Sequence, residues 1–89
     1  MPYIKQEDRE LYDDDINNLV CSLINVEFEA GHVVYIFYKV VVAWYNFNRK
    51  FTTINNIRGA LWSTLVEFDR IFASGYEDNK RRINGDIHE

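Results

Sequence analysis

The clearest periodic pattern in the chain lies in its last third, between Thr53 and Phe72. Apolar residues recur there three or four positions apart, which is the spacing that lines one face of an α-helix. Thr52 or Thr53 is suited to cap its start, and Gly75 to the left-handed residue after its end. The pattern predicts a helix ending near Ser74, with an apolar face formed by Ile54, Ile57, Leu61, Leu65, Phe68 and Phe72.

Gly59 interrupts this helical pattern. A glycine inside a helix costs about 1 kcal/mol relative to alanine. We therefore expect another backbone to approach closely at Gly59.

A second amphipathic pattern predicts a helix in the first third of the chain, after an extended or turn-like lead-in over residues 1–12. The run Asp13 to Asp15 lies near the expected start, where carboxylates accept free backbone N–H groups and complement the positive helix end. Ala30-Gly31 is the expected break. One side of the helix carries Tyr12, Ile16, Leu19, Val20, Leu23 and Val26.

The segment Val33 to Phe47 is open to two interpretations. Its β-branched and aromatic residues favour a strand by local propensity. Its length of about 15 residues without a turn favours a buried helix that is apolar nearly all round. We predict a helix, followed by a polar connection over Asn46 to Lys50 and by a short fourth helix over Tyr76 to Ile83. The expected fold is all-α, a small three-helix domain with a possible short fourth C-terminal helix.

The two ends of the chain resemble a short family of prokaryotes and their phages, whose members begin Met-Pro-Tyr-Ile and end in Tyr-Glu-Asp and Asn-Gly-Asp. The resemblance implies a helical fold and a phage-associated setting, and it implies no reaction. Gly75 stands where such proteins have proline, and polar residues expected over 61–71 are replaced. The matching residues are Met1, Pro2, Tyr3, Ile4, Arg9, Tyr12, Gly31, Tyr35, Ile54, Asn55, Ile57, Gly59, Leu61, Glu67, Phe68, Arg70, Tyr76, Glu77, Asp78, Asn84, Gly85 and Asp86.

Length and composition predict one helical domain over residues 1–89, with a mobile tail over 84–89. Aromatic residues make up 16% of the chain, a heavy load for so small an interior. A central helix that is apolar on all sides cannot be covered fully by two neighbours, so we expect a homo-oligomer. The expected interface residues are Tyr35, Tyr38, Val42, Trp44 and Tyr45.

The charge pattern disfavours nucleic acid as a partner. Net charge is −4, and residues 1–30 carry eight acidic and two basic side chains. Proteins that bind duplexes are usually basic, so we expect no duplex binding.

The apolar run Val33 to Tyr45 is too short to span a bilayer. A single cysteine and the lack of a secretory signal predict a cytoplasmic protein, in the host cytoplasm if it is phage-encoded.

Catalytic and metal chemistry lack the residues they need. The carboxylates do not repeat three or four positions apart on facing helices, and His32 and His88 have no partners at ligand spacing. Cys21 is expected to be a small buried apolar residue without a base to activate it. We therefore expect no enzyme activity, no metal and no cofactor.

Two functions remain as hypotheses. The first is a non-enzymatic, phage-associated interaction protein that self-associates and binds a host or phage protein. The alternative is an oligomeric sequestering protein that holds a nucleotide-type anion without turnover, because guanidinium groups clamp phosphate and aromatic rings stack on bases. Its expected binding residues are Arg58, Trp62, Tyr76, Arg81 and Arg82.

Overall fold

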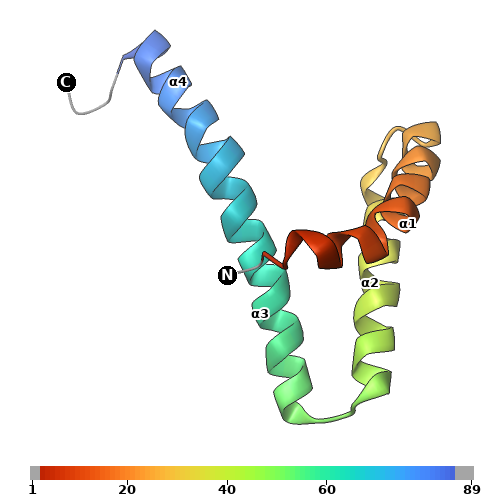
Figure 1. Cartoon of the computed structure of the whole chain (residues 1–89). Helices are drawn as coiled ribbons and strands as arrows, with labels where there is room; N and C mark the ends of the chain where they lie inside the picture. The colour runs from red at the N-terminus through yellow and green to blue at the C-terminus, as the bar shows by residue number, and fades with distance from the viewer. Residues whose placement is uncertain (1–2, 86–89) are drawn as a thin grey trace. The chain divides into compact units, whose positions relative to one another are not determined.

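The computed structural model describes residues 3–85, apart from the side chains of residues 78, 81 and 84, and these residues form helices joined by short turns (Figure 1). No strand occurs among them, which confirms the predicted all-α fold with three helices and a short fourth piece. The elements are α1 (Gln6–Asn25), α2 (Ala30–Phe47), α3 (Phe51–Phe68), the π-helical turn η1 (Asp69–Ala73) and α4 (Ser74–Asn84).

The first helix begins at Gln6, earlier than predicted. The carbonyl of Lys5 accepts the N–H groups of Asp8 and Arg9 at 3.0 and 3.2 Å, which closes the first turn. Glu7 and Asp8 lie in that turn and complement its positive end. The expected lead-in is therefore wrong from Gln6 onward. Asp13 to Asp15 lie within the helix, so they do not cap it.

The turn between α1 and α2 contains two non-glycine residues with left-handed backbones, Glu27 (φ 55°) and Phe28 (φ 52°). The N–H of Phe28 donates to the carbonyl of Leu23 at 2.9 Å, and the N–H of Glu27 donates to that of Ile24 at 2.9 Å. This pair of bonds is a Schellman motif, and Glu27 occupies the position that glycine usually takes. The turn after α1 therefore uses a left-handed backbone conformation that is unfavourable for a residue with a Cβ, such as Glu27.

The helix predicted over Val33 to Phe47 is confirmed as the main part of α2. The break predicted at Ala30-Gly31 is wrong, because the chain turns at the preceding residues and these two open the helix. The N–H groups of His32 and Val33 donate to the carbonyl of Glu29 at 3.0 and 3.3 Å. Only three of the 18 residues of α2 carry a fully polar side chain: His32, Lys39 and Asn46.

The third helix begins at Phe51, so neither Thr52 nor Thr53 is its cap. The carbonyl of Lys50 accepts the N–H groups of Thr53 and Ile54 at 3.1 and 3.3 Å, which makes the residue before Phe51 the start of the hydrogen-bonded turn. Thr53 is instead the one buried residue among those described. The short α2–α3 turn therefore uses backbone groups, rather than a threonine hydroxyl, to start α3.

Gly75 does not end the third helix, contrary to the prediction. The chain passes from α3 through η1 into α4 without a break, and Gly75 is helical. The N–H of Ser74 donates to the carbonyl of Asp69, five residues earlier, as in a π-turn. Glycine allows a left-handed residue but does not impose one. Gly85, with φ 86°, ends α4 instead.

The tail predicted over 84–89 is only partly covered by the structure. Asn84 belongs to α4, and residues 86–89 lie outside the described residues.

Gly59 lies within α3 and does not receive the close backbone contact that was predicted. A Cβ added there would meet no atom within 4 Å outside the helix's own backbone. The prediction is wrong because the described residues leave this side of α3 open. Gly59 therefore destabilises the helix relative to alanine, and no contact in the described chain requires a glycine there.

The described residues form two compact units, Tyr3–Ile57 and a second that begins at Arg58. No apolar residue among them is buried. Partial burial within the first unit occurs before the first turn, along α2 and around the second turn. The half-buried residues are Leu23, Val26, Val33, Ile36, Val41, Val42, Tyr45, Ile54 and Ile57. The single domain over 1–89 stays a prediction. The described chain forms helices but lacks the usual apolar core.

Candidate functional site

The predicted interface residues on α2 differ in how accessible they are. Tyr35, Tyr38 and Trp44 are exposed, whereas Val42 and Tyr45 are half-buried. The guanidinium Cζ of Arg49 lies 5.9 Å from the centre of the Tyr45 ring. The first three side chains are therefore free to meet a partner, and Tyr45 is partly occupied within its own chain. Their role in an interface stays a prediction.

Sequence reasoning left Phe37, Val40 and Phe47, which are exposed on the same helix, out of the expected interface. With Trp44 they follow a spacing of three, four and three residues, which places them along one side of α2. We call these four residues the phenylalanine seam. The spacing was readable in the sequence, but the nearly continuous apolar run of α2 gives several such sets, and only exposure separates them.

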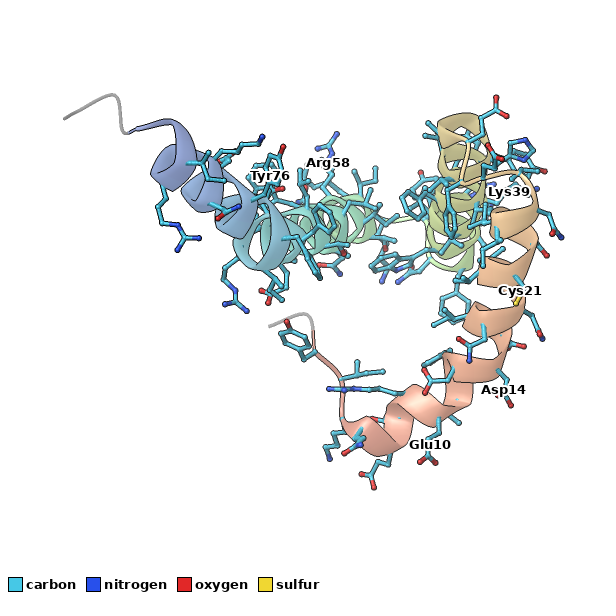
Figure 2. All side chains as sticks on the ribbon, turned by 90° about the horizontal axis from the view of Figure 1, so that it is seen from above. Glu10, Asp14, Cys21, Lys39, Arg58 and Tyr76 are labelled. Atoms are coloured by element: carbon cyan, nitrogen blue, oxygen red, sulfur yellow. The ribbon has the colours of Figure 1, made fainter. Side chains whose placement is uncertain are left out.

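The residues predicted to bind a nucleotide-type anion are spread along one continuous helical stretch. Arg58 and Trp62 lie on α3, whereas Tyr76 and Arg82 lie on α4 (Figure 2). Arg58 and Tyr76 are 18 positions apart, which corresponds to about 27 Å along a helix. These two groups therefore do not meet within one chain. The side chain of Arg81 lies outside the described residues.

The basic residues of α4 have partners on their own helix. Nη2 of Arg82 donates a hydrogen bond to Oδ1 of Asn79 at 2.8 Å. The ammonium of Lys80 lies 5.7 Å from the centre of the Tyr76 ring, within the range of a cation–π contact. Both contacts are local and solvent-exposed, so they stabilise α4 only weakly.

Glu67 and Arg70, three positions apart, form an ion pair at the surface. Nη2 of Arg70 lies 2.5 Å from Oε1 of Glu67, and Nε of Arg70 donates to Oε2 of the same carboxylate at 3.2 Å. The pair is bidentate, and Glu67 is half-buried while Arg70 is exposed. The ion pair joins the end of α3 to η1 and helps to order the helix there.

No group of three or more histidine, cysteine or acidic residues among the described residues could hold a metal ion. His32 contacts only Glu29, at 3.9 Å between Nε2 and Oε2. These two residues, with Gly31 and Tyr35, line a depression of about 450 Å³ that is wide open to solvent. His88 lies outside the described residues. The depression does not exclude water, so it does not resemble an active site.

Cys21 is exposed, which contradicts the predicted burial (Figure 2). It follows Ile16 by five positions, which places it on the side of α1 opposite the apolar stripe.

No helix of the described chain is long and apolar enough to cross a membrane.

Comparisons with known proteins give a family but no activity. A search of curated proteins and a search of solved structures each found no match. A family model described as a domain of unknown function, DUF6899, matches residues 1–87. Because this match covers nearly the whole chain, the protein belongs to the DUF6899 family.

Proposed function

We propose that this protein is a non-enzymatic helical interaction protein that self-associates through α2 and binds a protein partner. One observation carries the proposal: no apolar residue of the described chain is buried, although α2 is apolar nearly all round. Helices of this kind normally lie inside a protein. The missing cover is best supplied by a second molecule.

The energetic reason is the hydrophobic effect. Fully burying one valine or phenylalanine side chain contributes roughly 1.5–3 kcal/mol. The exposed residues of α2 include Val34, Phe37 and Phe47. Exposed apolar groups that lie together on a surface mark sites of protein association. Association would therefore supply stability that the separate helices lack.

The biological setting is part of the same proposal. The chain ends resemble prokaryotic and phage proteins, so we propose a phage- or mobile-element-associated protein that acts in the host cytoplasm on a host or phage protein. The exposed single cysteine fits a reducing compartment.

The alternative, sequestration of a nucleotide-type anion, needs residues from more than one chain. Arg58 and Tyr76 are about 27 Å apart along the helix, so a closed pocket would have to form at a junction between subunits. This requirement ranks the alternative below protein binding.

Native mass spectrometry of the protein purified from its own host tests both functions together. We expect a homo-oligomer without a bound nucleotide-type anion, accompanied by a protein partner under gentle conditions. A retained anion released unchanged would replace the first proposal by the alternative. A monomer with no companion would contradict the proposal.

A further inference from the structure

The phenylalanine seam is an exposed apolar stripe along α2. Its members Phe37, Val40, Trp44 and Phe47 are 57, 60, 38 and 91% exposed. The spacing of three, four and three residues is that of the core positions of a coiled coil, where side chains of one helix fill gaps on another. A second helix could therefore pack along the seam.

Lys39, the charged residue of α2, does not obstruct the seam. At 100° per residue it lies about 100° round the helix from Val40 and 160° from Phe37. Its ammonium can therefore remain in water when the seam is covered (Figure 2 labels Lys39).

The two ends of α2 carry opposite charges. Glu27 and Glu29 precede the helix, and Arg49 and Lys50 follow it, all four exposed. Among the described residues neither glutamate pairs with a lysine or arginine, and Glu29 contacts only the imidazole of His32. Arg49 donates to Oδ1 of Asn46 on its own chain. Glu29 and Lys50 are therefore the charges that can meet a partner with the same charges in reverse order.

We infer that the partner on the phenylalanine seam is a second copy of α2 that runs antiparallel to the first. This inference rests on the self-association proposed above and adds its surface and direction. Phe37 of each copy then packs against Phe47 of the other, and Val40 against Trp44. Such pairing is self-complementary, as a two-fold dimer requires.

Charge decides the direction. In a parallel pair, Glu29 would approach Glu29 of the second copy, and Lys50 would approach its own counterpart. In an antiparallel pair the acidic end of each helix lies near the basic end of the other, and the helix dipoles also oppose each other. Because like charges repel at both ends of a parallel pair, the antiparallel pair is favoured.

Sedimentation equilibrium of two matched variants tests the surface. Val40 is 60% exposed on the seam, and Lys39 is exposed about 100° away from it round α2. We expect Val40→Glu to weaken the dimer at least about tenfold, because two charges would be buried together. Lys39→Glu should leave the dissociation constant nearly unchanged. Far-UV circular dichroism should show equal helicity for both.

The outcomes separate this inference from the proposed function. A dimer broken by Lys39→Glu but not by Val40→Glu would overturn the seam and keep self-association. A dimer unaffected by either would place the contact away from α2. A wild-type monomer, in which the chain's own residues 58–85 cover the seam, would contradict both proposals.

Charge exchange tests the direction. Glu29→Lys alone and Lys50→Glu alone should each weaken the dimer roughly threefold to tenfold, because each creates like charges at both ends of an antiparallel pair. The double variant Glu29→Lys/Lys50→Glu should recover wild-type affinity. If the single variants have no effect, the parallel arrangement would hold, since like charges there merely change sign.

Discussion

At the scale of single residues, Glu27 has a backbone conformation that is unfavourable for its type. A non-glycine residue in the left-handed region costs roughly 1–2 kcal/mol, and Glu27 adopts it at φ 55°. Replacement by glycine removes this backbone cost. The gain in stability is smaller than the cost, because glycine loses more conformational entropy on folding. We expect Glu27→Gly to raise the free energy of unfolding by about 0.5–1 kcal/mol in urea titrations.

Glu27→Ala is the control for this prediction. It removes the same carboxylate but keeps the Cβ that strains the turn, so it should give no gain. Equal stabilisation by both variants would show that the charge, rather than the backbone, disfavours glutamate at this position.

Gly59 gives a second prediction at this scale. An added Cβ would meet nothing within 4 Å outside the helix's own backbone. Gly59→Ala should therefore stabilise α3 by about 0.8–1 kcal/mol and raise the melting temperature. A fall in melting temperature would mean that a second molecule packs closely against Gly59, as the sequence first suggested.

At the scale of elements, acidic residues that repel one another destabilise α1. Glu10 and Asp14 are four positions apart and both exposed, so their charges repel along one side of the helix (Figure 2). Asp14→Lys replaces that repulsion by a favourable Glu-to-Lys pair. We expect a gain of roughly 0.4–1 kcal/mol in unfolding free energy at low salt, which shrinks at high salt.

The neighbouring variant Asp15→Lys is matched to it. It makes the same change in net charge, but no charged residue lies three or four positions from residue 15. A gain equal to that of Asp14→Lys would attribute the effect to net charge alone and contradict the pairwise explanation.

Element types were predictable from the sequence, and several boundaries were not. The length of Val33 to Phe47 correctly outweighed its β-branched residues, because no turn residue interrupts it. Gly75 misled because glycine permits a helix end without requiring one. The turn at Glu27 was missed because its residue type argues against the conformation it adopts. The π-turn at Asp69–Ala73 has no sequence signal that we recognise.

At the scale of the whole molecule, the aromatic content already indicated rings that one small chain cannot bury. The structure goes further, since no described apolar residue is buried. The candidate anion-binding residues do not meet within one chain, because an unbroken helix separates Arg58 from Tyr76 by about 27 Å. That separation depended on Gly75 being helical, which the sequence did not reveal.

Self-association is the central claim of the proposed function. Sedimentation equilibrium of the wild-type protein across the micromolar range measures it most directly. We predict a dimer or larger oligomer that dissociates reversibly on dilution, because the exposed side chains of α2 need a second molecule to cover them. A single monomeric species over the whole range would contradict this prediction and would return those side chains to an intramolecular core.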